Sequence, residues 1–250
     1  MTAADIQAEI KENFRHNFTV NVLDGAFFWF GTSFIATRTI APLFLSYLTD
    51  NTFIFGLLSM IVSTGWLLPQ LFTANWVQRL PVKKVVPVVH GFFWERIPVL
   101  LLPLAALAAL YSTRFAVFLF LFLIGWHVIG AGIVAVGWQD MIAKIFPVKW
   151  RGRYFGIANF LGNGTGILGT AAAAWMLDTI TYPHNFMIAF GCAGIFILIS
   201  WIFLRMTREP ARVSPLPPQD SKSYWRSLPQ IIRTDRNYRI CLLYTSPSPR

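Results

Sequence analysis

Residues 115–138 read FAVFLFLFLIGWHVIGAGIVAVGW and contain no Asp, Glu, Lys or Arg. An α-helix needs about 20 apolar residues to cross the roughly 30 Å of hydrocarbon in a bilayer. The stretch therefore predicts a membrane-spanning helix, which we place at residues 114–139. Further long apolar runs on both sides of it predict six spans in all. These runs lie at residues 18–46, 53–75, 85–110, 154–177 and 186–205.

The composition also favours lipid as the solvent of this chain. It is 55% hydrophobic and only 13% charged, whereas a soluble globular domain carries about 25% charged residues. The 23 Phe and 10 Trp residues are typical of lipid contact and of anchoring at the membrane interface. We therefore predict an all-α fold, a polytopic membrane helical bundle.

The net charge of +10 is unevenly distributed along the chain. Of the 21 Lys and Arg residues, 17 fall in the N-terminal tail, in alternate loops or after the last span, and only Arg114 falls in the opposite loops. Cytoplasmic loops carry such an excess of Lys and Arg. The charge therefore predicts a multi-pass protein of the inner or plasma membrane with a cytoplasmic N-terminus, and it attracts anionic lipid headgroups. We expect no nucleic-acid partner.

Four segments follow from this pattern: a cytoplasmic tail at 1–17, a transmembrane domain at 18–206, a Pro-rich cytoplasmic linker at 207–240 and a last segment at 241–250. The last segment reads CLLYTSPSPR. It resembles the translation of a sequencing-library adapter, which predicts a non-native tail. A true disordered terminus is the alternative.

Six spans, a cytoplasmic N-terminus and a long linker together resemble the N-terminal half of a major facilitator superfamily transporter. The loop after the second span carries basic residues at positions where the family has them: Arg79, Lys83 and Lys84. Ala74, Gln78 and Pro81 replace the Gly, Asp and Gly of the family motif. The loop after the fourth span has an Arg-Gly-Arg pattern at 151–153, which is also common in the family.

The resemblance implies two inverted three-helix repeats, with the C-terminal half of the same protein missing. It also implies transport by alternating access, and we expect the chain alone to give no uptake. It marks a set of cytoplasmic gating candidates: Arg79, Lys83, Lys84, Asp140, Arg151 and Arg153. For Asp140, an ion pair with Lys144 one helical turn on is the plainer prediction, and a contact with Arg151 or Arg153 is the alternative.

Charged residues inside a span cost about 2.5–3.5 kcal/mol on insertion scales, so they usually face a cavity or a partner. Asp24, Arg38, Glu95 and Arg96 are of this kind. On one continuous helix, Asp24 and Arg38 would share a face to within about 40°. Glu95 and Arg96 would point to different neighbours. Four prolines within the spans can bend or interrupt helices and free a carbonyl group toward a cavity: Pro42, Pro69, Pro98 and Pro103.

These four residues and His127 are the candidates for binding a substrate or coupling a proton. A buried carboxylate can carry a proton, and an arginine can hold an anionic group by two hydrogen bonds. The alternative is a structural charge pair between helices, such as Arg96 with Asp24. For His127 in the fourth span, a hydrogen bond between helices is favoured over a proton relay.

Several other function classes find no support in the sequence. There is no phosphate-binding Gly-x-x-x-x-Gly-Lys run, no His/Cys cluster for a metal and no Gly-x-Ser-x-Gly elbow of a hydrolase. We predict no cofactor and no enzyme activity. The predicted function is secondary active transport of a small solute, driven by a proton or ion gradient or by the concentration gradient of the solute itself. The alternatives are a membrane enzyme using Asp24, Glu95, His127 or Asp140, and a scaffold or sensor acting through the linker.

Overall fold

The computed structural model describes residues 3–211, 225–226, 230 and 233–245. Throughout these ranges the regular structure is helical, with no strand, which confirms the predicted all-α class. The helices of the N-terminal part are α1 (Ala3–Glu12), α2 (Phe14–Ser33), α3 (Ile40–Ser46), α4 (Thr52–Arg79), the π-helices η1 (Val86–His90) and η2 (Phe92–Arg96), and α5 (Ile97–Ala108). The others are α6 (Thr113–Ile145), α7 (Val148–Thr179), α8 (His184–Arg205) and α10 (Arg236–Thr245).

Four helical segments in the described ranges are long and apolar enough to cross a membrane: α4, Val86–Ala108, α6 and α8. They match four of the six predicted runs and make the chain a multi-pass membrane protein. The runs predicted at 18–46 and 154–177 lie in α2–α3 and in α7 and do not reach this apolarity. The predicted tail at 241–250 falls partly in α10, and residues 246–250 and most of the linker lie outside the described residues.

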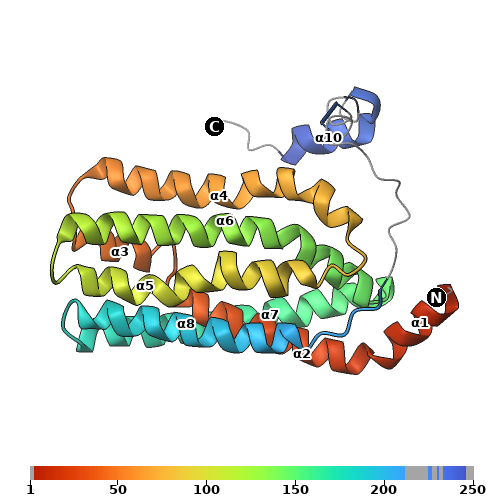
Figure 1. Cartoon of the computed structure of the whole chain (residues 1–250), viewed down its shortest axis with the longest axis horizontal. Helices are drawn as coiled ribbons and strands as arrows, with labels where there is room; N and C mark the ends of the chain where they lie inside the picture. The colour runs from red at the N-terminus through yellow and green to blue at the C-terminus, as the bar shows by residue number, and fades with distance from the viewer. Residues whose placement is uncertain (1–2, 212–224, 227–229, 231–232, 246–250) are drawn as a thin grey trace.

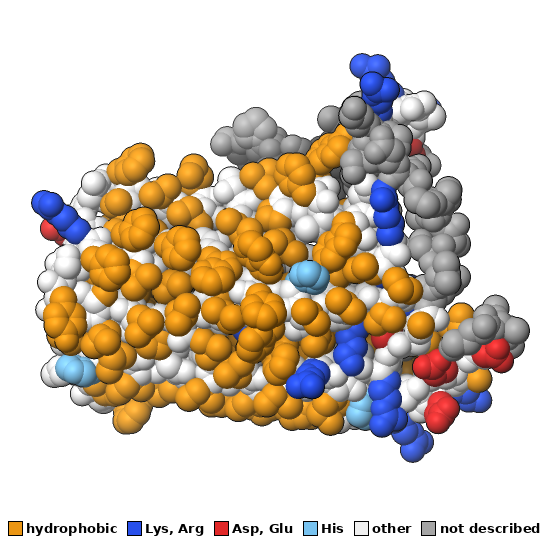
Figure 2. Space-filling view, viewed as in Figure 1, with side chains coloured by type: hydrophobic (Ala, Val, Ile, Leu, Met, Phe, Trp, Pro, Cys, Tyr) orange, Lys and Arg blue, Asp and Glu red, His pale blue; other side chains and the backbone are white. Residues whose placement is uncertain are grey.

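The long helices lie side by side, and successive ones run in opposite directions (Figure 1). Helix α2 packs on α7 and α8, α4 packs on α6, and α5 packs on both α6 and α8. Hydrophobic side chains cover the middle of the visible face, and most Lys and Arg gather toward one end (Figure 2). We call this the basic end. Arg79, Lys83, Lys84, Lys144 and Arg151 lie there, at helix ends or in the loops that join them.

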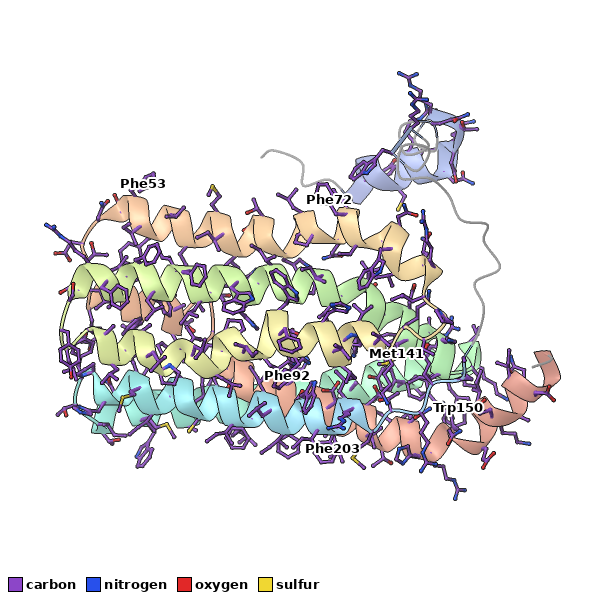
Figure 3. The ribbon with its side chains drawn as sticks, viewed as in Figure 1. Phe53, Phe72, Phe92, Met141, Trp150 and Phe203 are labelled. Carbon is purple, nitrogen blue, oxygen red and sulfur yellow. The ribbon has the colours of Figure 1, made fainter. Side chains whose placement is uncertain are left out.

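Helices α4 and α7 are the least covered of the long helices. Only Leu58, Gly65 and Val77 are buried on α4. Phe53 and Phe72 project from the outer side of this helix (Figure 3), with 72% and 67% of their surface exposed. Large exposed apolar side chains along a span are what contact with lipid requires, because lipid tails are as apolar as the side chains.

Aromatic rings fill the centre of the bundle away from the basic end. Phe44, Phe120, Phe186 and Phe190 are fully buried, and the ring centroids of Phe44 and Phe186 lie 5.0 Å apart. Lipid offers these rings an environment as apolar as their neighbours do. Close packing, rather than transfer out of water, therefore stabilises this core.

The first predicted span is interrupted, which corrects the expectation of one continuous helix. Helix α2 ends at Ser33, residues 34–39 are not helical, and α3 begins at Ile40. The ring of Pro42 would clash with the carbonyl of residue 38 in an unbroken helix. Ser33 Oγ also donates to the carbonyl of Phe30, at 2.6 Å, a local bond that competes with the helical ladder. Asp24 and Arg38 therefore do not share one helix face.

A close crossing of α6 and η2 depends on Gly130. A Cβ atom there would overlap the carbonyl of Trp94 and lie 2.8 Å from the amide nitrogen of Glu95. The same carbonyl lacks its helical donor, because the residue four positions on is Pro98, which has no N–H. Gly130 thus lets α6 approach the backbone at the point where the third span departs from α-helical geometry.

We expect Gly130→Ala to lower the free energy of unfolding by about 1–3 kcal/mol, because backbone atoms would have to move to admit the methyl group. The measurement is thermal unfolding of the purified chain in a non-ionic detergent. Gly164→Ala on α7 is the matched control, since nothing lies within 4 Å of a Cβ atom there. Equal stability of the two variants would contradict the close crossing.

Candidate functional site

A cavity of about 1280 Å³ lies among four of the long helices. Its wall comes from α2 and the break after it (Phe28, Trp29, Thr32, Ser33, Ile35, Ala36, Thr37, Arg38), α4 (Val62, Ser63, Trp66, Leu67), α6 (His127, Val128, Ala131) and α7 (Gly162, Asn163, Gly166, Ile167, Thr170, Ala171, Ala174). Drug-sized ligands occupy sites of about 300–1,000 Å³. The cavity is therefore large enough for a small organic molecule.

The structure separates the five candidates for binding and coupling. Arg38 and His127 line the cavity. Asp24, Glu95 and Arg96 do not line it and are buried, with 5%, 4% and 3% of their surface exposed. These three residues therefore lie inside the bundle beside the cavity, where the guanidinium of Arg96 lies 5.9 Å from the ring centroid of Phe28 on the wall.

Asp24, Glu95, Arg96 and Ser200 form a polar cluster inside the bundle. Arg96 Nη1 forms an ion pair and hydrogen bond with Glu95 Oε2, and Ser200 Oγ donates to Asp24 Oδ1 at 2.6 Å. The expectation that Glu95 and Arg96 point to different neighbours is wrong. Their side chains are long enough to meet, and a low dielectric favours pairing of buried charges. Arg96 makes no ion pair with Asp24.

Helix η2 carries Glu95 and Arg96 of this cluster, and η1 and η2 both have backbone carbonyls that accept hydrogen bonds from neighbouring helices. His127 Nδ1 lies 2.9 Å from the carbonyl oxygen of Glu95, and Trp201 Nε1 donates to the carbonyl of Val88 at 2.8 Å. A carbonyl oxygen only accepts, so Nδ1 of His127 carries a proton, and in the neutral imidazole Nε2 keeps its lone pair. The predicted hydrogen bond of His127 between helices is confirmed. Short π-helical stretches often mark functional sites.

At the basic end, three lysines meet one buried carboxylate. The backbone N–H groups of Lys83 and Lys84 donate to Glu209 Oε1 and Oε2 at 2.9 and 2.6 Å, and Lys144 Nζ lies 2.8 Å from Oε1. The side chain of Glu209 has no exposed surface. We call these four residues the Glu209 clasp. The predicted ion pair of Lys144 with Asp140 is wrong, because Glu209 takes the amine and a buried carboxylate needs such partners.

The segment that holds Glu209 is also tied to α2. Asn17 Nδ2 donates to the carbonyl of Arg208, and the amide of Arg208 donates to Asn17 Oδ1, both at 2.8 Å. Asn21 Nδ2 donates to Thr207 Oγ1 at 3.0 Å. Sequence reasoning missed Glu209, although it is the single acidic residue between Arg205 and Arg212. The segment thus connects the end of α8 with α2, α6 and the start of the third span.

The other gating candidates make local contacts. Arg79 donates to Asn75 Oδ1 at 3.1 Å, Arg151 donates to the carbonyls of Phe146 and Ala143, and the guanidinium of Arg153 lies 4.8 Å from the ring centroid of Trp150. Within the described ranges, neither Arg151 nor Arg153 forms an ion pair with Asp140. Burial lowers the pKa of the Lys83 and Lys84 amines.

Comparison with known protein families, curated proteins and solved structures finds no match to this chain. Among the described residues no group of three or more His, Cys, Asp or Glu side chains could hold a metal ion. The cavity, the polar cluster and the Glu209 clasp are therefore the observations on which a function can be built.

We expect Arg96→Met to lower the free energy of unfolding by about 3–5 kcal/mol, because it leaves the buried Glu95 carboxylate without its partner. The double variant Glu95→Leu, Arg96→Met removes both charges and should recover most of the loss. Thermal unfolding of the three chains in detergent measures this. A single variant as stable as the parent would rule out the buried pair.

Glu209→Gln replaces an acceptor-only carboxylate with an amide whose NH₂ group would face N–H donors. We expect a loss of about 1–3 kcal/mol at the clasp, so that trypsin cleaves after Arg208 about tenfold faster. Glu12→Gln, at an exposed position on α1, is the control and should leave the cleavage rate unchanged. Equal cleavage of the two variants would mean that the clasp does not hold the segment.

Proposed function

We propose that the chain forms one half of a secondary active transporter that moves a small solute by alternating access. The observation that carries this proposal is the open cavity of about 1280 Å³ between helices of a membrane-type bundle. Transporters of this kind bind solutes near the middle of the bilayer, between helical repeats. The resemblance to the major facilitator superfamily suggests that a second six-helix half supplies the other wall.

The packing of the helices supports an inverted repeat. Exchanging α2 with α6, α4 with α7 and the third span with α8 maps the five most extensively packed pairs onto one another. The pair α2–α7 becomes α6–α4, α2–α8 becomes α6–α5, and α5–α8 is unchanged. The two members of each exchanged pair, α2 and α6, α4 and α7, and the third span and α8, run in opposite directions (Figure 1). Both properties are expected of two three-helix repeats with inverted topology.

In this proposal α2 and α7 are the remaining two spans. Their lower apolarity has a physical reason, because both carry polar residues on the cavity wall: Thr32, Ser33, Asn163 and Thr170. At about 1.5 Å per residue the 32 residues of α7 extend well beyond the hydrocarbon core. The basic end is assigned to the cytoplasm of the inner or plasma membrane.

The residues then divide by role. Arg38 and His127 meet the solute, since both line the cavity. Asp24 is the acidic group best suited to carry a coupling proton, because it is hydrogen-bonded to Ser200 whereas Glu95 is neutralised by Arg96. The Glu209 clasp closes the basic end of the half.

The contacts of the acidic residues and His127 favour transport over the alternative of a membrane enzyme. Such an enzyme requires at least two of Asp24, Glu95, His127 and Asp140 to have their side chains within hydrogen-bonding reach. Among the described residues, His127 bonds only to the backbone of Glu95, and Asp24 bonds to Ser200. No acid–base pair of side chains results.

A water-filled cavity predicts selective labelling of its wall. In a background with Cys192 and Cys241 replaced by Ala, we expect Asn163→Cys to react with a membrane-impermeant maleimide in membranes. The control is Leu168→Cys on the same helix. The native Leu168 side chain is 64% exposed but is not part of the cavity wall. The control variant should react at least about tenfold more slowly, because a thiol in lipid does not ionise. Similar rates at the two positions would contradict the transporter proposal.

A further inference from the structure

The wall of the cavity carries one full charge, and that charge is positive. Among its lining residues Arg38 is the only Arg or Lys, and no Asp or Glu is present. Within the described part of the chain, the Arg38 side chain makes no hydrogen bond or ion pair, and it is exposed. A positive charge in a low-dielectric wall attracts anions and repels cations.

The break between α2 and α3 adds backbone donors beside Arg38. Phe34, Ile35 and Thr39 donate their N–H groups to nearby carbonyls. The N–H groups of Ala36, Thr37 and Arg38 have no acceptor among the described residues. These three residues line the cavity. Non-helical backbone at membrane depth is tolerated only where it is buried in protein or meets a water-filled cavity, so these donors are available to water or to a solute.

The rest of the wall is largely apolar. Trp29 and Trp66 lie on it with 52% and 43% of their surface exposed, and Leu67 and Ile167 add aliphatic surface. The lone pair on His127 Nε2 can accept one hydrogen bond. A strongly polar solute such as a sugar would leave most of its hydroxyl groups unpaired against such walls, at a cost for each.

We propose that the cavity binds an amphipathic organic anion. Its carboxylate or similar group would bind Arg38 and the N–H groups of residues 36–38, and its apolar body would pack on Trp29 and Trp66. That this anion is the transported solute rests on the function proposed above. Its binding does not, since a purified chain can bind a ligand without moving it.

Three probes of one shape and different charge test the proposal: 3-phenylpropionate, 3-phenylpropanol and 3-phenylpropylamine. Binding to the full chain in a non-ionic detergent is followed by tryptophan fluorescence, because Trp29 and Trp66 lie on the wall. We expect the anion to bind about tenfold more tightly than the alcohol, as a charge-assisted hydrogen bond provides. The amine should give no saturable signal.

The variant Arg38→Gln should bring the affinity for 3-phenylpropionate down to that for the alcohol, and Arg38→Lys should retain part of the preference. Arg114→Gln, at an exposed position outside the cavity, should leave all three affinities unchanged. Thermal unfolding of Arg38→Gln should match the parent, because the side chain has no partner to lose.

Equal affinity for the three probes, no saturable binding by any of them, or an anion preference that survives Arg38→Gln would overturn the site. These outcomes do not bear on the maleimide labelling of Asn163→Cys, which tests the water-filled cavity. Anion preference that depends on Arg38 supports the site even where that labelling fails.

Discussion

The bundle depends on one constraint: every backbone N–H and C=O group needs a hydrogen-bond partner, and lipid offers none. Regular helices meet this need internally, so the informative places are those where the helical ladder is broken. In the third span the carbonyls of Val88 and Glu95 receive N–H groups from Trp201 and His127 on neighbouring helices. At residues 34–39 the break opens instead onto the cavity. Side chains of neighbouring helices thus bind the freed carbonyls of the third span, whereas the backbone groups at residues 34–39 are available to a ligand.

The same constraint governs charge. Inside the bundle, Glu95 is paired with Arg96 and Asp24 accepts from Ser200. At the basic end Glu209 is fully enclosed by two backbone donors and Lys144. Arg38, whose side chain has no hydrogen bond or ion pair among the described residues, lies on the cavity wall. The charged residues that stabilise the fold are thus separated in space from Arg38, which can bind a solute.

Hydrophobic runs were enough to predict an all-helical membrane bundle and four of its spans. The break in the first span had a signal in Pro42, but its exact extent depends on local bonds such as that of Ser33. The angle between Glu95 and Arg96 on a helix did not predict their pairing, because long side chains reach beyond their own direction. The Glu209 clasp could not be found from spacing, since Glu209 lies 65 residues from Lys144 and is brought to it only by packing of α8. The π-helices left no periodic signal that distinguishes them from an α-helix.

Hydrogen–deuterium exchange of the chain in lipid nanodiscs tests this dependence on backbone partners most directly. We expect the amides of Ala36, Thr37 and Arg38 to exchange within seconds to minutes, since they have no acceptor and line the cavity. Those of residues 115–138 and of the third span should stay protected for hours. Protection of residues 36–38 equal to that of α6, or rapid exchange along the third span, would contradict the division between an open and a sealed break.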